Sequence, residues 1–242
     1  RKSLNLISVR IIQQDYAPAE QVKRTAKRMG ISTDIRAVDA IALGTSEVIP
    51  LEMVSAYAAY ANKGVYSKPI AITKIEDRYG NIIREYHSAQ FEVLSEETAY
   101  LMTNLMQTVM DRGTGGSARW KYNFTRPAAG KTGTTQGWSD AWFVGFTPQL
   151  ATGVWFGVDD YQVSLGKGQD GSKAALPSWA QFMRESHKTL ELPRVNFQKP
   201  SGVIVFEICS VSKTGARKAC PIEKEVYKSG TEPVQKCRIH RN

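Results

Sequence analysis

The chain has 242 residues, enough for one large domain or for one domain with a small appendage. Apolar residues make up 42% of it, which excludes a disordered protein, and no apolar run is long enough to span a bilayer. The net charge of +9 comes without a basic stripe interleaved with aromatic residues, so it indicates a soluble surface and speaks against nucleic-acid binding.

The first part of the chain is predicted to be mainly helical. A polar turn at residues 3–5 opens an apolar pattern over residues 4–12, which we interpret as a buried helix. A basic, amphipathic helix follows over residues 18–30, opened by Pro and closed by Gly. Residues 34–46 resemble a loop, and a strong helix covers residues 50–62. The chain begins without Met, so we expect it to be part of a longer protein.

The middle of the chain predicts a hairpin and a long helix. Residues 70–86 have the apolar pattern of a β-hairpin that turns at residues 79–81. Ser95 is placed to cap the next helix, and two glutamates in its first turn favour the helix dipole. This helix is mostly buried in our interpretation, and it stops at the glycine-rich residues 111–116.

Three strands are predicted next, over residues 128–135, 141–146 and 151–158. Because short loops join them, they must pair antiparallel. A helix over residues 175–188 then carries one apolar stripe suited to packing on the sheet, and residues 203–208 form the last strand. The stripe consists of Leu176, Trp179, Phe182 and Met183.

The first of these strands carries the residues most suggestive of chemistry. Lys131 supplies a cation, and the spacing of Thr132 and Thr134 puts two hydroxyls on one face of a strand. Gly133 lets the backbone approach a ligand, so the N–H near Thr134 can act as an oxyanion donor. Such a set suits a substrate carboxylate and a developing oxyanion, although an exposed edge strand could also carry it.

A second polar pair lies far upstream, at the predicted N-terminal turn. Ser3 and Asn5 are two residues apart and can turn toward one pocket. A hydroxyl there can relay a proton, and an amide can hold a substrate amide. The three histidines lie in unrelated settings, so a Ser–His–Asp triad is unsupported.

Ser3-x-Asn5 followed by Lys131-Thr132-Gly133 resembles the transpeptidase domain of class A, bifunctional penicillin-binding proteins. Further similarity lies in a G-T-G turn at residues 113–115 and in the two strands after K-T-G. The resemblance covers roughly residues 1–190 and implies the serine β-lactamase fold. It implies that Ser3 shuttles a proton and that Lys131 tunes Ser3 and attracts the substrate's terminal carboxylate.

The resemblance also implies substrate-binding roles. Asn5 would bind the donor peptide, Thr132 and Thr134 would hydrogen-bond its carboxylate, and Thr134 would lend its N–H to the oxyanion hole. Gly133 belongs to the same wall. Trp138 lies just past this strand, and we expect it to line the substrate cleft.

The family's nucleophile motif, S-x-x-K, is not found where the resemblance requires it. In the family this motif precedes S-x-N, which here opens the chain. The string at residues 210–213 does match S-x-x-K, and it overlaps a second K-T-G at residues 213–215. One lysine would then serve two roles, so we interpret both as chance matches. The reactive serine is expected in an N-terminal segment of the same protein.

All three cysteines lie near the C-terminus, at Cys209, Cys220 and Cys237. Cysteines confined to a tail suggest one disulfide with a spare thiol, in an oxidising compartment. The alternative is a zinc site with His240 as the fourth ligand, which we rank below the disulfide because the spacing is not that of a known zinc knuckle. No metal or cofactor is therefore assigned.

The sequence thus predicts an α+β fold with an antiparallel sheet flanked by helices. Residues 1–194 form the major part of a transpeptidase domain, and residues 195–242 form a linker and a small cysteine-containing appendage. The implied activity is D-alanyl-D-alanine transpeptidation of peptidoglycan stem peptides, with β-lactams as inhibitors, outside the bacterial cytoplasmic membrane. The alternatives are a serine β-lactamase and a non-catalytic peptidoglycan-binding fragment. A membrane is contacted only through an anchor elsewhere in the protein.

Overall fold

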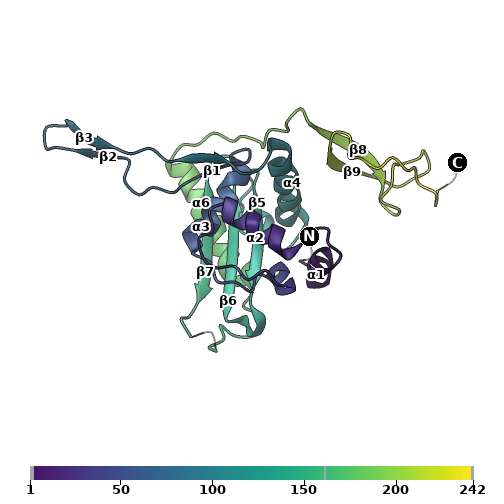
Figure 1. Cartoon of the computed structure of the whole chain (residues 1–242), viewed down its shortest axis with the longest axis horizontal. Helices are drawn as coiled ribbons and strands as arrows, with labels where there is room; N and C mark the ends of the chain where they lie inside the picture. Colours follow the sequence, from purple (N-terminus) through teal and green to yellow (C-terminus); the bar gives the residue numbers. More distant parts are fainter. Residues whose placement is uncertain (1–2, 161, 241–242) are drawn as a thin grey trace.

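A three-stranded antiparallel sheet lies at the centre of the molecule (Figure 1), whose computed structural model describes residues 3–160 and 162–240. Its strands are β5 (Ala129–Thr134), β6 (Asp140–Phe146) and β7 (Ala151–Gly157), in the order β5-β6-β7. Lys131 pairs with Val144 and Thr134 with Ala141, so β5 is an edge strand of this sheet. The three predicted strands and their antiparallel pairing are confirmed.

Helix α6 (Leu176–Thr189) covers one face of the sheet. Trp179 of this helix is fully buried between the rings of Phe143 and Phe124, whose centroids lie 4.9 and 5.2 Å from its own. A Cβ at Gly145 would lie 2.8 Å from the Trp179 ring, so only glycine permits this close packing. The predicted helix is confirmed and is preceded by a short π-helical turn, η3 (Gly171–Ala175).

The opposite face of the sheet is covered by α3 (Pro50–Ala61) and by α4 (Glu96–Arg112), which packs along β5. Phe146 is one of the residues that point to this side, because side chains alternate along a strand. Its ring stacks on Tyr60 of α3. Ser95 caps α4 by accepting the Thr98 N–H at 3.3 Å, as the sequence predicts. The next helix, α5 (Ser117–Trp120), is a single turn.

The first helix, α1 (Asn5–Gln13), is not buried as the sequence predicts. Of its residues only Ile12 is buried, while Leu6 and Ile7 are 63% and 54% exposed. Its main neighbour is the short 3-10 helix η1 (Asp39–Leu43), so within residues 3–160 and 162–240 no element covers its outer apolar face. The basic helix α2 (Ala19–Arg28) follows the prediction.

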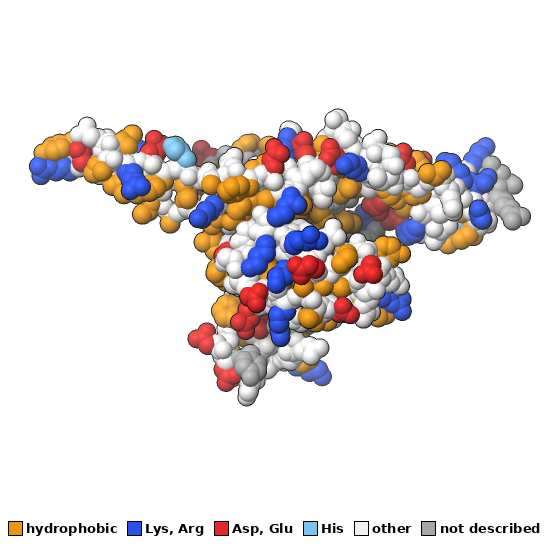
Figure 2. Space-filling model, viewed as in Figure 1, with side chains coloured by type: hydrophobic (Ala, Val, Ile, Leu, Met, Phe, Trp, Pro, Cys, Tyr) orange, Lys and Arg blue, Asp and Glu red, His pale blue; other side chains and the backbone are white. Residues whose placement is uncertain are grey.

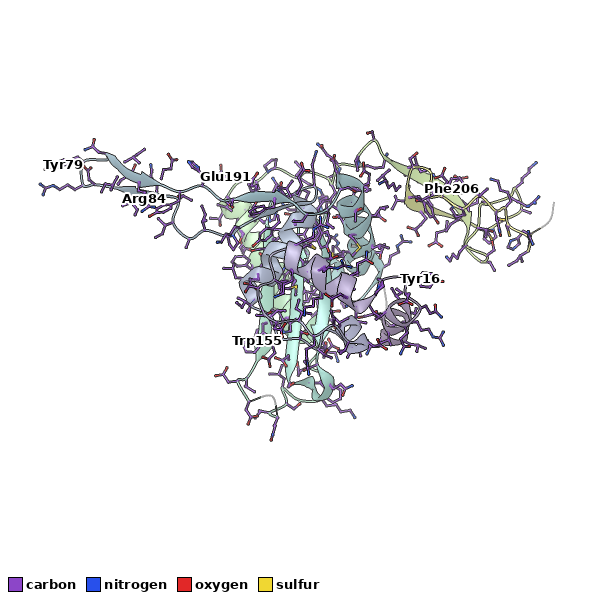
Figure 3. The ribbon with its side chains drawn as sticks, in the orientation of Figure 1. Tyr16, Tyr79, Arg84, Trp155, Glu191 and Phe206 are labelled. Carbon is purple, nitrogen blue, oxygen red and sulfur yellow. The ribbon has the colours of Figure 1, made fainter. Side chains whose placement is uncertain are left out.

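Four short strands lie outside the central sheet. β2 (Lys74–Glu76) and β3 (Ile82–Glu85) form the predicted hairpin, which projects from the body and carries Tyr79 at its turn (Figure 3). β1 (Val65–Ser67) pairs with β4 (Gln90–Glu92) at its base, and the sequence does not predict this pair. The hairpin strands are shorter than predicted because the flanking isoleucines Ile70 and Ile72 stay outside them.

The C-terminal appendage lies at the other end of the molecule, beyond α4 (Figure 1). It is a two-stranded ribbon of β8 (Val203–Cys209) and β9 (Ile222–Lys228), so the prediction that β8 is the last strand is wrong. β9 has three charged residues in succession, at 223–225, so its sequence shows no regular alternation and gives only a weak strand signal. Phe182 of α6 is 56% exposed and does not belong to the buried stripe.

Charge is distributed without a single basic stripe on the face drawn in Figure 2, where Lys and Arg side chains are scattered over body, hairpin and appendage. Among the described residues, no helix is long and apolar enough to cross a membrane.

Candidate active site

Lys131 on β5 and Ser3 at the start of the chain meet in the structure although 128 residues separate them. The Lys131 Nζ donates to Ser3 Oγ at 2.8 Å and to the Thr132 carbonyl at 2.7 Å. Alternation along β5 directs Lys131 toward the face opposite Thr132, and its long side chain brings the ammonium back to Ser3. Ser3 has a positive φ of 48°, in the left-handed region, at the turn before α1.

A polar cavity of about 260 Å³ lies beside this pair. Both polar motifs of the sequence contribute to it, together with the glycine-rich turn before α5 and the start of η3. Its lining residues are Ser3, Asn5, Thr114, Thr132, Thr134, Asp170 and Ser172. The structure therefore brings Ser3, Asn5, Thr132 and Thr134 to one cavity, as the sequence predicts.

The two threonines of β5 are held by neighbours on the cavity wall. The Thr132 hydroxyl oxygen lies 2.9 Å from that of Thr114, and the Thr134 hydroxyl accepts the Gly171 N–H at 3.1 Å. A Cβ at Gly133 would lie 3.1 Å from the Cβ of Trp142, so this glycine also has a packing reason. These contacts orient both hydroxyls without using all of their hydrogen-bonding capacity.

Burial lowers the pKa of the Lys131 ammonium below its usual value. The cause is desolvation, which penalises the charged form of a lysine. A lowered pKa makes the ammonium a better proton donor toward the serine hydroxyl that it hydrogen-bonds. The site thus combines a hydrogen-bonded lysine–serine pair with two threonine hydroxyls.

A second cavity, of about 300 Å³, also borders β5 and shares Thr132 and Thr134 with the first. It is lined by Lys131 together with apolar residues of α3 and β6, among them Met53 and Trp142. Trp138 lines neither cavity, in contrast to the prediction. It ends the short 3-10 turn η2 (Gln136–Trp138) with a φ of 58°, beyond the end of β5, while Tyr57 and Trp142 are the aromatic residues that line the second cavity.

Sequence reasoning missed Asp170 and Ser172 as cavity residues. The Asp170 carboxylate accepts from the Ser172 N–H at 2.9 Å and from the Ser172 hydroxyl at 2.5 Å, and it caps η3. An Asp-x-Ser sequence before an apolar helix is a capping signal and could have located the helix start. Nothing in the sequence alone connects this cap to β5.

The second S-x-x-K and K-T-G strings lie in the appendage, in the turn after β8. The Lys213 N–H donates to the Cys209 carbonyl at 2.9 Å, and its ammonium pairs with the Glu223 carboxylate at 2.5 Å. Lys213 therefore serves a local turn, which agrees with its interpretation as a chance match.

The three cysteines are free thiols in the structure, so the predicted disulfide is not formed. Their sulfur atoms and the Nδ1 or Nε2 of His240 all lie within 4.8 Å of one another. This is the arrangement of the alternative that the sequence ranks second, a metal site.

The helix-covered antiparallel sheet with its polar edge-strand cleft is the α+β fold of the β-lactamase and transpeptidase class. The chain superposes on penicillin-binding protein 1A from Haemophilus influenzae with a TM-score of 0.87 and 26% identity, over 98% of this chain and 40% of that one. It also superposes on PonA1 from Mycobacterium tuberculosis in complex with penicillin V, with a TM-score of 0.63 and 26% identity, over 80% of this chain and 56% of that one.

The sequence itself places the chain in a family. Residues 17–184 match the penicillin binding protein transpeptidase domain, and residues 199–242 match the C-terminal domain of penicillin-binding protein 1A. The chain therefore belongs to the penicillin-binding protein transpeptidase family. Penicillin-binding protein 1A of Aquifex aeolicus is 36% identical over 97% of this chain, which spans 31% of that relative's length. The chain thus corresponds to about a third of such proteins.

Proposed function

We propose that this chain forms the substrate-binding wall of a peptidoglycan D,D-transpeptidase. The observation that carries the proposal is the 2.8 Å hydrogen bond from Lys131 Nζ to Ser3 Oγ, at a cavity that Thr132 and Thr134 also line. This is the arrangement that a serine acyl transfer needs beside its nucleophile: a proton relay and an anchor for a carboxylate.

In this proposal the donor stem peptide is transferred in two steps. The reactive serine attacks the carbonyl of the D-alanyl-D-alanine bond, forming a serine ester, and the terminal D-alanine leaves as an amine that receives its proton through Ser3. An amine of a neighbouring stem peptide then attacks the ester and releases the serine. Thr132 and Thr134 hold the terminal carboxylate of the donor, Asn5 holds its amide, and the Thr134 N–H faces the oxyanion.

The reactive serine is proposed to lie in a segment of the same protein with the sequence S-x-x-K. Support comes from apolar surface that the described residues leave uncovered. A cavity of about 490 Å³ between α2 and α3 is lined mainly by apolar residues, including Met53 and Met102, and Leu6 and Ile7 of α1 are exposed. A further helix packed here would cover this surface and bring its serine to β5.

For the whole protein we propose a peptidoglycan synthase outside the bacterial cytoplasmic membrane, held there by an anchor elsewhere in its chain. The proposed substrates are peptidoglycan stem peptides, and β-lactams would acylate the same serine. No cofactor is required by this chemistry. We also propose a division near residue 194 between the transpeptidase domain and the linker with its appendage.

Acylation of the full-length protein by a fluorescent penicillin tests the proposal. Lys131→Ala removes the cation and the hydrogen-bond partner of Ser3, the residue proposed to relay the proton, so we expect the acylation rate constant to fall by about 10²-fold or more. Lys121→Ala is the matched control, because Lys121 is exposed and lies away from the cavity. An acylation rate equal to wild type in Lys131→Ala would sink the proposal.

The same preparation separates the alternative functions. Steady turnover of a chromogenic cephalosporin, without a persistent acyl-enzyme, would identify a β-lactamase. Binding of a D-Ala-D-Ala peptide without any acylation of the full-length protein would identify a non-catalytic peptidoglycan-binding protein. The transpeptidase is expected to form a long-lived penicilloyl ester and to cross-link stem peptides.

A further inference from the structure

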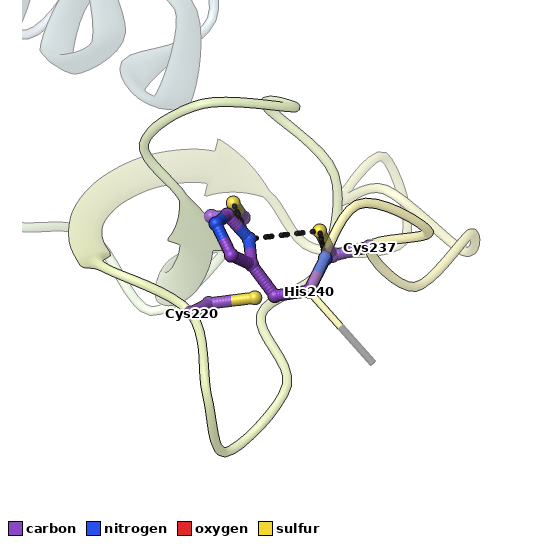
Figure 4. A group of neighbouring side chains, drawn as sticks. Cys220, Cys237 and His240 are labelled. Atoms are coloured by element: carbon purple, nitrogen blue, oxygen red, sulfur yellow. Dashed lines mark hydrogen bonds between the residues drawn. The ribbon is translucent and has the colours of Figure 1, made fainter. Parts of the chain in front are cut away.

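Four metal-binding side chains converge in the C-terminal appendage, far from the cleft. Cys209 ends β8, Cys220 stands two residues before β9, and Cys237 and His240 follow in the last turn of the chain. Figure 4 shows Cys220, Cys237 and His240 directed toward a common point. Cys209 and Cys237 are completely buried, and Cys220 is 8% exposed. The proposed transpeptidase function makes no use of this cluster.

We propose that Cys209, Cys220, Cys237 and His240 bind a structural Zn²⁺ ion. Three thiolates and one imidazole are a common ligand set of closed zinc sites. The set is soft enough to select zinc over Mg²⁺ or Ca²⁺, which prefer oxygen ligands. The four residues leave no open coordination position, so the role of the ion is structural.

The distances between the ligand atoms fit a tetrahedral site. The Sγ atoms of Cys209 and Cys237 lie 3.4 and 3.5 Å from Nδ1 of His240. In a tetrahedron with Zn–S near 2.3 Å and Zn–N near 2.0 Å, the S···N edge is about 3.5 Å and the S···S edge about 3.8 Å. The ligand atoms all lie within 4.8 Å of one another, so small side-chain shifts complete the tetrahedron.

The backbone around the cluster fixes the cysteines. The N–H groups of Cys209 and Cys237 donate to the carbonyls of Thr214 and Gly215, at 2.8 and 2.9 Å. Further, the Arg217 N–H donates to Cys220 Sγ at 3.2 Å, as an outer-shell group does that stabilises a metal-bound thiolate.

Positive charge lies next to the cluster as well. The Arg217 side chain donates from Nε to the Cys237 carbonyl at 2.7 Å. Three thiolates around Zn²⁺ leave one net negative charge on the site, and this guanidinium lies where it offsets that charge.

Apart from the cysteines, the appendage buries few apolar side chains, chiefly Val203 and Ile208 of β8. Its buried cluster consists of the three cysteines with Ala216 packed against them, while Val205, Val211 and Ile222 are more than half exposed. A unit of this size rarely folds on apolar burial alone and needs disulfides or a metal. One disulfide would use two thiols and leave the third cysteine and His240 without a role, whereas one zinc ion uses all four side chains.

The metal content of the full-length protein, purified without a metal-affinity tag, tests the proposal. We expect zinc by mass spectrometry, and expect Cys220→Ser to contain about one zinc ion less per chain than wild type. X-ray absorption at the zinc edge is expected to show three sulfur neighbours at about 2.3 Å and one nitrogen at about 2.0 Å. This measurement uses the wild-type protein and does not depend on the folding of a variant.

His240→Ala refines the test, with His87→Ala as the matched control on the exposed hairpin end. We expect zinc release to a chromogenic chelator to be accelerated more than tenfold in His240→Ala, at least the effect of losing an outer-shell partner, and to be unchanged in His87→Ala. Three outcomes would overturn the proposal: no metal with three free thiols, no metal with two thiols in a disulfide, or iron in place of zinc. Acylation by penicillin reports on the cleft and stays independent of each.

Discussion

The body and the appendage solve the problem of stability in different ways. The body buries large rings: Trp179, Phe124 and Phe143 are at most 1% exposed and contact one another edge to face. The appendage places three thiols at its centre and leaves Val205, Val211 and Ile222 more than half exposed. Apolar burial scales with the amount of chain available, so a long unit can rely on it and a short one cannot.

In the body, the residues that form the rigid core are different from the residues of the candidate site. Thr132 and Thr134 of its candidate site lie on an edge strand, and the apolar core beneath the sheet fixes the position of that strand. In the appendage the polar groups are themselves the core. The two units touch where β9 lies near α4, the helix that packs along β5. This contact makes it possible to ask whether they unfold separately.

Removal of the proposed zinc ion is expected to have the largest effect on the comparison. Stripping the full-length protein with a mercurial reagent and a chelator should abolish the amide hydrogen-exchange protection of β8 and β9, because binding of structural zinc supplies about 10 kcal/mol or more in small zinc domains. Protection of β5–β7 should persist. A mock-treated, zinc-saturated sample is the control, and a joint loss of protection in both regions would show that the body depends on the appendage.

Trp179→Ala tests the stability of the body in the same comparison. The change removes a fully buried ring and the indole N–H that donates to the carbonyls of Gly145 and Thr152, at 3.3 and 3.1 Å. Large-to-small changes of this kind cost about 3–5 kcal/mol, so we expect a loss of this size in the free energy of unfolding of the body by urea titration.

Trp120→Ala is the control for that measurement. Trp120 is 77% exposed, so its removal should change the free energy of unfolding by no more than about 0.5 kcal/mol. Zinc content should be wild type in both variants. Equal losses in Trp179→Ala and Trp120→Ala would contradict the assignment of the core.

The sequence predicts the body better than the appendage, and the same contrast explains why. Apolar periodicity locates α3, α4, α6 and the three central strands because burial against a large core imposes it. No residue of β9 is buried, so burial imposes no apolar alternation on its sequence, and the strand is missed. The prediction that α1 is buried fails in the opposite way. The helix has an apolar pattern, but the described residues leave much of its apolar surface uncovered.

The candidate site could be predicted in its residue types and less so in its geometry. Ser3, Asn5, Lys131, Thr132 and Thr134 are found from two short motifs, and the structure joins those motifs. Trp138 is expected in the cleft because it lies just past β5 in the chain, but Gly137 and Trp138 both have positive φ, and Trp138 lines neither cavity. The proposed zinc site requires all three cysteines to approach His240, and the spacing of these residues along the chain does not determine whether they do.

His187 provides a smaller, pH-dependent test that is specific to the body. It is 1% exposed on α6, with Nδ1 2.7 Å from the Met183 carbonyl and Nε2 3.0 Å from the Thr147 hydroxyl. That hydroxyl accepts the Gln149 and Leu150 N–H groups at 3.3 and 3.1 Å, so it donates its proton to Nε2, and the ring donates from Nδ1. The contact with Thr147 requires the neutral imidazole, whereas the Met183 carbonyl can accept from Nδ1–H in either charge state. Burial accordingly lowers the pKa of His187 in the folded state.

Because of this histidine, the stability of the body should fall as the pH is lowered. In the unfolded chain a histidine titrates near pH 6.5, so below about this pH the unfolded state binds a proton that the native state refuses. The free energy of unfolding of the body, followed by hydrogen exchange of β6 amides, should decrease from pH 7.5 to 5.5 with a slope of at most about 1.4 kcal/mol per pH unit from this residue. His187→Gln keeps a donor and an acceptor without the titration and should flatten the profile, while His87→Gln should leave it unchanged. An equal slope in wild type and His187→Gln would assign the acid sensitivity to other groups.

Acid also protonates the cysteine ligands and releases zinc from the appendage. Lowering the pH would then destabilise both units. The body loses stability because its folded state excludes a proton from His187, and the appendage loses stability because protons displace its zinc ion.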